Sequence, residues 1–348
     1  MEPDTKNVLI LNPLEDSRWD AFVASQSDAT PFHSTGWLQA LAESFRFRVT
    51  ALCCAGPDGR ITCGIPFIEK TGLNGKKKRI CLPFTDRCGP IGDSADFAEF
   101  VLPHLLQGER NGAARTEIRD TLPDGGDVRD ETLYWGHRIA LPSRAEDCRL
   151  RFSDCCKRNL RKAEKTGLRA VIGTDRDLLK AFYRLHVLTR RKLGVPVQPK
   201  SFIDAIHRRM VKPGKGWLVV VFAKDVPIAA GLFLMEFGQV VWKYGASNPS
   251  YLRICPNNFL LWKAIEHSCS LGMQVFDFGR TELSQVGLRS FKLGWGSQEF
   301  EYRSYTWPRT EKPKVFRRAL QRLASPVIRN SPVMVSRVLG EAFYGYFP

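Results

Sequence analysis

The most regular pattern of apolar and polar positions begins in the middle of the chain. Residues 167–173 (GLRAVIG) alternate with a period of two, which predicts a strand. In residues 175–194 apolar side chains recur every three or four positions, which predicts a helix with one apolar face, formed by Leu178, Phe182, Leu185 and Leu188. A second helix is predicted at 199–210, because a proline and a serine stand near its start.

Periodic patterns of apolar residues continue to residue 307. They predict three strands at 217–224, 227–237 and 239–247, a helix at 257–272, a strand at 275–279, a short helix at 288–294 and a last strand at 299–307. The order β-α-α-β-β-β-α-β-α-β predicts an α/β fold with mixed sheets. It resembles the order of elements in the GCN5-related acyltransferases.

A short segment of the first half resembles one in the second half. The stretches ITCGIPFIE (61–69) and IAAGLFLME (228–236) share an isoleucine, a glycine and a glutamate at one offset of 167 residues. Each completes a predicted hairpin, and each hairpin follows a helical stretch. We interpret the chain as two tandem copies of one fold.

These patterns divide the 348 residues into three parts. We predict a first GCN5-like domain at 1–145, a second at 146–308 and a basic amphipathic helical tail at 309–348. The tail carries eight lysines and arginines between 309 and 340 against the single acid Glu311. Such a stretch either packs on its own domain or docks on an anionic membrane face, and both readings stay open.

Charge is distributed unevenly between the predicted domains. Residues 1–145 hold 17 Lys and Arg against 20 Asp and Glu, whereas residues 146–348 hold 35 against 16. The second half therefore carries almost all of the excess positive charge, which indicates an anionic partner for that half. A phosphate-bearing substrate, RNA such as tRNA, and an acidic membrane surface all fit this charge.

The ten cysteines and six histidines show no metal-ligand spacing, so we expect reduced thiols and no metal. The start of the chain is acidic and unlike a signal peptide, and no run of eighteen apolar residues occurs. We therefore expect a cytoplasmic protein, either free or peripheral at the inner membrane face.

Five short stretches resemble one enzyme family. They are FHSTGWLQAL (32–41), RNLRKAEKTGL (158–168), VWKYGAS (241–247), FDFGRTE (276–282) and GLRSFKLGWG (287–296). In this order they resemble the signatures of the Fem-type transferases, also called FemAB-like or BioF2-like acyltransferases. The resemblance covers nearly the whole chain and is strongest to FemAB-related proteins of bacterial exopolysaccharide and PEP-CTERM/exosortase systems.

The resemblance implies an enzyme that transfers an acyl or aminoacyl group to an amine of a cell-envelope or exopolysaccharide precursor. The amine attacks directly, without a covalent enzyme intermediate. No cofactor is implied beyond the acyl donor, which is either aminoacyl-tRNA or acyl-CoA. Two alternatives stay open: an acyl-CoA-dependent N-acetyltransferase of polysaccharide biosynthesis, and a non-catalytic module that binds RNA or a membrane.

The donor is not settled by the loops that precede the predicted helices. Acetyltransferases of the GCN5 type bind the coenzyme A pyrophosphate through a glycine-rich loop before a helix. The corresponding stretch of the second domain, SNPSYLRICPNN (247–258), contains two prolines and no glycine. The long helical hairpin that some Fem-type members carry is also missing, which weakens the tRNA assignment.

The resemblance assigns Lys292 to transition-state stabilisation. It lies in SFKLGWG beside Phe291 and Trp295, and a lysine among aromatic residues is held partly desolvated, where its charge acts strongly. Without the resemblance, Lys292 reads as a surface lysine on a short helix. We include Trp295 as a substrate-binding candidate.

Polar residues also end two predicted strands, where ligands bind in α/β sheets. Asp277 and Glu282 are candidate proton acceptors and Arg280 a candidate phosphate clamp. Their structural alternatives are a backbone bond for Asp277 and an Arg280–Glu282 pair. On the neighbouring strand, Lys243 is a substrate-binding candidate and Tyr244 a hydrogen-bond donor to the reacting group, or else a core tyrosine.

The helix around residues 157–165 concentrates positive charge. Like charges four residues apart cost about 0.2–0.5 kcal/mol per pair on a bare helix, and an anionic ligand would remove that cost. We therefore add Arg158, Asn159 and Arg161 to the substrate-binding candidates, with a solvated helix face as the alternative.

Overall fold

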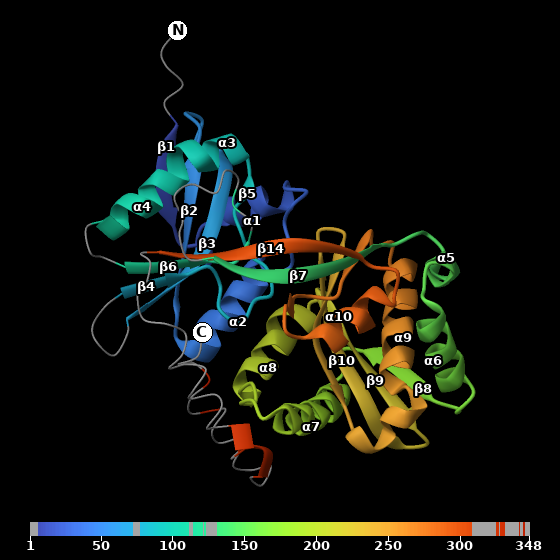
Figure 1. The fold of residues 1–348 in the computed structure, drawn as a ribbon. Coiled ribbons are helices and arrows are strands. Elements are labelled where there is room, and N and C mark those ends of the chain that lie inside the picture. The colour runs from blue at the N-terminus through green and yellow to red at the C-terminus, as the bar shows by residue number, and fades with distance from the viewer. Residues whose placement is uncertain are drawn as a thin grey trace. The chain divides into compact units, whose positions relative to one another are not determined.

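The computed structural model (Figure 1) describes residues 6–71, 77–110, 114–120, 122, 131–307, 325, 326, 328–330, 341 and 344. Contacts between Cα atoms divide the chain into two compact units. Unit 1 comprises Met1–Tyr134 and Glu301–Glu311 with the last residue, and unit 2 comprises Trp135–Phe300 and Lys312–Phe347. Within the described part, no helix has the length and apolar composition to cross a membrane.

Unit 1 is a mixed sheet with helices. Its strands are β1 (Asn7–Leu11), β2 (Arg48–Ala55), β3 (Ile61–Thr71), β4 (Lys77–Ile80), β5 (Ile91–Gly92), β6 (Ala114–Ile118) and the end of β14 (Gln298–Trp307). The main order is β1-β2-β3-β4-β6-β14, in which β4 and β6 are parallel. Its helical segments are α1 (Ser17–Ala24), α2 (Thr35–Phe45), α3 (Ser94–Asp96), η1 (Phe97–Val101) and α4 (Leu102–Arg110).

Unit 2 contains most of the regular structure predicted from the sequence. Its strands are β7 (Glu131–Ala140, from Trp135 on), β8 (Arg169–Gly173), β9 (Gly216–Ala223), β10 (Val226–Glu236), β11 (Gln239–Ser247), β12 (Val275–Asp277) and β13 (Thr281–Glu282). Its helical segments are α5 (Ala145–Leu150), α6 (Asp154–Glu164), α7 (Arg176–Leu193), α8 (Lys200–Ile206), η2 (His207–Val211), η3 (Pro249–Ile254), α9 (Pro256–Ser270) and α10 (Val286–Leu293). The sheet order is β7-β12-β11-β10-β9-β8.

Helices cover the sheet of unit 2 through two sets of buried side chains. Trp217, Val219 and Val221 of β9 belong to the cluster that includes residues of α9. Leu218 and Val220 are also buried and, by the alternation of a strand, point to the opposite side, and α7 also packs on β9. Because both faces of β9 are covered, its sequence WLVVVFA is apolar throughout rather than alternating.

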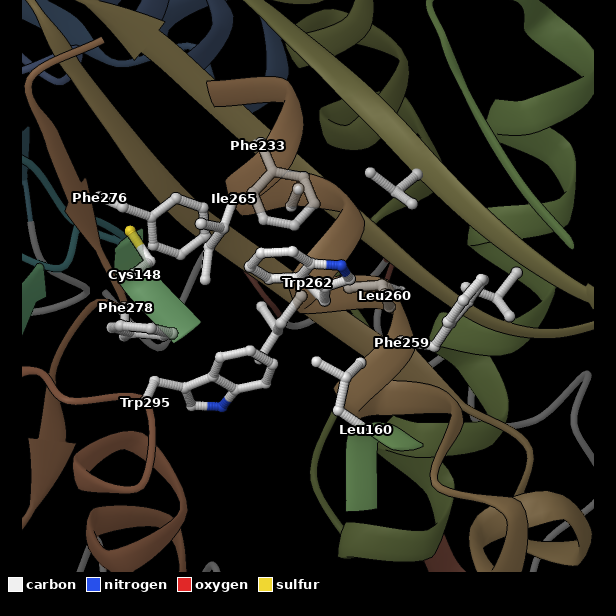
Figure 2. Close-up of a cluster of buried hydrophobic side chains, with 14 of the residues drawn as sticks. Cys148, Leu160, Phe233, Phe259, Leu260, Trp262, Ile265, Phe276, Phe278 and Trp295 are labelled. Carbon is white, nitrogen blue, oxygen red and sulfur yellow. The ribbon is translucent and has the colours of Figure 1, made fainter. Parts of the chain in front are cut away.

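The cluster on the α9 side contains a group of aromatic rings (Figure 2). Phe276 and Phe278 contact each other with ring centroids 5.0 Å apart. Trp295 is fully buried, 5.0 Å from the ring of Phe152 in an edge-on arrangement and 6.5 Å from Phe278. Phe276 and Phe278 therefore share the core side of FDF with the tryptophan of SFKLGWG, and Asp277 between them is also buried.

The parallel pair at the centre of unit 2 is short. Strand β11 pairs with β12 only from Gln239 to Val241, where β12 ends after Asp277. Residues 242–247 of β11 continue, and among the described strands they pair only with β10. This open edge of β11 lies next to the end of β12, where the sequence analysis predicts the candidate site residues Asp277, Arg280 and Glu282.

The fold agrees with the sequence in class and differs in detail. Two tandem α/β units with mixed sheets are confirmed, as are the strands and helices predicted between 167 and 307. Unit 2 begins at Trp135 and the chain returns to unit 1 at Glu301, whereas the predicted boundaries were 145/146 and 308/309. Most of the predicted tail, 309–348, lies outside the described residues.

The burial of Trp295 leads to a stability prediction. Replacing Trp295 by Ala should lower the free energy of unfolding of unit 2 by about 3–5 kcal/mol, because a large buried side chain leaves a cavity. Denaturant unfolding followed by circular dichroism measures this loss, with the half-exposed Leu293→Ala as the control, expected to change little. A stable Trp295→Ala variant that loses only substrate affinity would instead support the substrate-binding role.

Candidate active site

Lys292 is buried rather than at the surface. It lies on α10 with 3% of its surface exposed, and its Nζ donates hydrogen bonds to the backbone carbonyls of Gly279 (2.8 Å) and Arg280 (3.1 Å). The stretches FDFGRTE and SFKLGWG therefore meet through this side chain. Gly279 has a φ of +69°, a conformation that glycine adopts without strain, and this shapes the turn whose carbonyls face the lysine.

Asp277 holds the same turn from the other side. Its Oδ1 accepts a hydrogen bond from the Gly279 N–H at 2.7 Å, and its Oδ2 accepts one from Arg138 Nε at 2.8 Å. The carboxylate is thus occupied by an Asx-type turn and an ion pair, with 12% of the side chain exposed. This arrangement favours an orienting role over that of a proton acceptor.

Two strands bring further titratable groups near Lys292, and the sequence analysis did not predict them. His137 on β7 is completely buried, and its Nε2 lies 3.0 Å from Glu299 Oε2 on β14. Glu299 also accepts two hydrogen bonds from Arg289, at 2.6 and 2.7 Å. Burial, reinforced by the charge of Lys292, lowers the pKa of His137, so its imidazole is neutral at pH 7.

The charged groups described so far can be summed. Lys292, Arg138 and Arg289 carry positive charge and Asp277 and Glu299 carry negative charge, so these five groups sum to +1 with His137 neutral. The hydrogen bonds from Arg289 hold the pKa of Glu299 below its usual range, so the acid stays ionised. A net positive, largely buried cluster favours negative charge that develops close to it.

The two other candidates of this stretch are more accessible. Arg280 is partly exposed, and its backbone carbonyl is one of the acceptors of Lys292. The side chain of Glu282 is exposed, and its N–H donates to Gln285 Oε1 at 3.2 Å. Between them Thr281 is fully buried, and its hydroxyl has no hydrogen-bond partner among the described residues.

A second group of contacts surrounds Tyr244 on β11. The Tyr244 ring is half-buried, 5.2 Å from the ring of His186 on α7, and Lys243 Nζ lies 5.1 Å from its centroid. Lys243 is 9% exposed and His186 2% exposed. Burial lowers the pKa of His186 to about 3, so this imidazole is also neutral. The sequence pattern places His186 on a helix but does not reveal its contact with Tyr244, which lies 58 residues away on another element.

Helix α6 carries the three remaining candidates. Arg158 and Arg161 are exposed, and no ion pair joins either of them to another described residue. Asn159 is half-buried, with Nδ2 3.8 Å from Cys155 Sγ. The start of α6 is bonded to the end of α10. The N-cap residue Ser153 donates its N–H to the Gly294 carbonyl at 2.9 Å, and the Ser153 hydroxyl accepts a hydrogen bond from the Cys156 N–H. The basic face thus starts close to the helix that carries Lys292.

The described residues contain no group of three or more His, Cys, Asp or Glu that would hold a metal ion. All ten cysteines are free, and most of them are buried. Burial raises the pKa of Cys156, at the start of α6, to about 12, which keeps it a thiol rather than a thiolate nucleophile.

The second half of the chain matches a family model. Residues 152–302 match the model described as "Acetyltransferase (GNAT) domain", and this range contains Lys292, Asp277, Tyr244 and α6. This part of unit 2 is thus similar to a GNAT acetyltransferase domain. No curated protein sequence matches the chain significantly.

Solved structures resemble the chain over both units. FemX is 15% identical with a TM-score of 0.65, covering 85% of this chain and 96% of its own. The C-terminal domain of a putative lysylphosphatidylglycerol synthetase from Agrobacterium fabrum is 12% identical with a TM-score of 0.56, covering 91% and 96%. The structure titled L-PGS from Bacillus licheniformis is 13% identical with a TM-score of 0.54, covering 90% and 98%. At these identities the likeness concerns the fold, which the chain shares with FemX.

The contacts of Asp277 generate a prediction that separates its two roles. Asp277→Asn keeps an oxygen for the Gly279 N–H and removes the charge facing Arg138. If Asp277 orients the turn, the free energy of unfolding should fall by about 1–2 kcal/mol, with a modest loss of activity. Asp177→Asn, in an exposed ion pair, is the matched control and should change stability little. Unchanged stability with a loss of kcat above about 10²-fold would identify a general base.

Proposed function

We propose that this protein is an N-acyltransferase or aminoacyl transferase that forms an amide on a cell-envelope or exopolysaccharide precursor. The observation that supports it most directly is the buried Lys292, bonded to the strand-end turn 279–280 inside the region that matches the GNAT domain model. The likeness to FemX and to the lysylphosphatidylglycerol synthetase domains is consistent with an aminoacyl group as the transferred unit.

The proposed step is a direct displacement. The nitrogen of a neutral amine attacks the carbonyl carbon of the donor, a C–N bond forms, and the carbonyl oxygen takes up negative charge. The C–O bond of an aminoacyl ester or the C–S bond of a thioester then breaks, and the amine proton ends on the leaving group or on solvent. Lys292 stabilises the oxyanion, because its positive charge is held in place before the reaction and away from bulk water.

Structure around β11 favours an aminoacyl donor over coenzyme A. The connection to α9 is occupied by the 3₁₀ helix η3, and α9 begins with Pro256, which has no N–H to offer a phosphate. Its N-cap residue Cys255 has a φ of +55° and gives no side-chain cap. The pyrophosphate cradle that a glycine-rich loop would build is therefore replaced by a helical turn.

The acceptor is proposed from the resemblance alone. Acyl transfer to an exopolysaccharide precursor and the association with PEP-CTERM/exosortase systems stay predictions, since none of the matched proteins carries those descriptions. The same holds for tRNA and for an anionic membrane face as partners. The basic tail proposed to dock there lies mostly outside the described residues.

The donor experiment tests the proposed function. The purified full-length chain is incubated with radiolabelled aminoacyl-tRNA from a mixed charged pool, or with acetyl-CoA, and an amine-bearing envelope or polysaccharide precursor fraction. Mass spectrometry then detects a new amide on the acceptor. Transfer from aminoacyl-tRNA supports the proposal, and transfer from acetyl-CoA supports the N-acetyltransferase alternative. Binding of tRNA or membranes without transfer from either donor would favour the non-catalytic alternative.

Lys292→Ala should lower kcat by roughly 10²–10³-fold, because Lys292 acts on charge that appears only in the transition state. Lys292→Met, which keeps the aliphatic stem, separates lost charge from lost packing. Lys263→Ala is the control, because Lys263 pairs with Glu266 on α9 and should leave kcat unchanged. A Lys292→Met enzyme that remains folded with wild-type kcat would remove Lys292 from the mechanism.

The basic face of α6 should act on binding. Arg158→Ala combined with Arg161→Ala should raise KM for the phosphate-bearing substrate roughly tenfold and lower kcat less, because contacts made equally in ground and transition state affect KM. The control removes two exposed arginines of α7, Arg176 and Arg184, with the same change in net charge. Equal effects of the two double variants would indicate that the basic face of α6 is a solvated surface without a role in substrate binding.

A further inference from the structure

A chain of side-chain hydrogen bonds connects the C-terminal segment to the His186 imidazole. Tyr344 accepts a hydrogen bond at its hydroxyl oxygen from Gln198 Nε2 at 2.9 Å. The other end of the same amide, Gln198 Oε1, lies 2.6 Å from His186 Nε2. Gln198 is 4% exposed, so neither end of its amide is free to exchange its partner for bulk water.

The order of donors and acceptors in this chain fixes the state of the histidine. Because the amide nitrogen is turned toward Tyr344, the amide oxygen faces His186 and requires a proton on Nε2. The imidazole is neutral, since burial lowers its pKa to about 3, and its Nδ1 is therefore an unprotonated acceptor. That Nδ1 is buried and has no hydrogen-bond partner among the described residues.

Several described residues of the C-terminal segment contact unit 2. Glu341 accepts hydrogen bonds from the Lys200 N–H at 2.7 Å and from the Ser201 hydroxyl at 3.4 Å. Ile328 is 3% exposed. A Cβ at Gly194 would lie 2.1 Å from Ser325 Oγ, so this segment approaches the end of α7 closely. At these described positions the segment packs on unit 2.

His186 in turn faces the strand that carries two candidate site residues. Its ring lies between Phe182, stacked at 5.3 Å, and Tyr244, tilted at 5.2 Å. One turn further along α7, Thr189 exchanges hydrogen bonds with the backbone of Ser247 at 3.0 and 3.2 Å. Helix α7 therefore contacts the open end of β11 at Tyr244 and at Ser247.

We propose that Gln198 and Tyr344 are positioning residues of the candidate site, which together lock His186 in its Nε2–H form against Tyr244. This proposal rests on the proposed function in one respect only, the membership of Tyr244 in the substrate site. Tyr344 then acts on the candidate site through Gln198 and His186.

Nuclear magnetic resonance of the full-length chain, labelled with ¹⁵N in histidine and with assigned tyrosine ring signals, tests the lock without any substrate. The wild type should show His186 protonated at Nε2 only, at every pH from 5 to 8. Tyr344→Phe removes the acceptor of Gln198 Nε2, so the amide can turn over and part of His186 should shift its proton to Nδ1, with a displacement of the Tyr244 ring signals.

Matched variants distinguish the lock from a general loosening. Tyr183→Phe is the control, because the Tyr183 hydroxyl donates to the backbone carbonyl of Gln198 and leaves the amide side chain untouched. Gln198→Glu keeps an acceptor for His186 and should preserve the Nε2–H form, whereas Gln198→Leu should lose it. An unchanged tautomer and unchanged Tyr244 signals in Tyr344→Phe would overturn the proposal.

Kinetics then test the functional part. With whichever donor gives transfer, Tyr344→Phe and Gln198→Leu should lower kcat/KM roughly tenfold, while Gln198→Glu and Tyr183→Phe retain most of it. A shifted tautomer with wild-type kcat/KM would overturn the positioning role. If the wild type transfers from neither donor, the proposed function fails by itself, and the Tyr244 ring signals of Tyr344→Phe still decide whether the lock exists.

Discussion

The hydrogen bonds of the Lys292 amine to the carbonyls of residues 279 and 280 are the interaction on which the candidate site depends. A buried amine without partners would be destabilising by several kcal/mol, so the turn after β12 has to present its carbonyls to this side chain. Asp277 fixes that turn through the Gly279 N–H, and Arg138 fixes Asp277. Strands β7 and β12 and helix α10 thus share one polar centre directly beside the aromatic core.

The charged groups of that centre are held by specific contacts. The acids Asp277 and Glu299 are each held by an arginine, and His137 is kept neutral by burial and by the lysine itself. The Lys292 amine donates to two backbone carbonyls, which hold its charge in place beside the turn. A buried, fixed positive charge favours negative charge that develops close to it.

Local patterns predicted the elements of unit 2 well, because α7, β9, β10, β11 and α9 are long and strongly periodic. The same patterns placed Asp277 and Lys292 at the ends of adjacent elements. They could not reveal Arg138 or His137, whose partners Asp277 and Glu299 lie 139 and 162 residues away in sequence. Trp295 shows the opposite difficulty, because the sequence analysis includes it as a substrate-binding candidate and its side chain is completely buried. Which face of a short helix is buried depends on what packs against it, and that information is not local.

The path of the chain through β7 and β14 has a consequence for biosynthesis. Residues Trp135–Phe300 of unit 2 form one uninterrupted stretch between the two main parts of unit 1, and the chain returns to unit 2 at Lys312. Strand β6 acquires its partner β14 only through residues 305–307. A ribosome therefore releases the whole insertion before the strand that completes the N-terminal sheet, although N-terminal domains usually fold first. Strand β6 therefore waits for its partner β14 while residues 135–300, which carry the candidate active site, are translated, and unit 2 in turn receives Tyr344 only after β14 has been made.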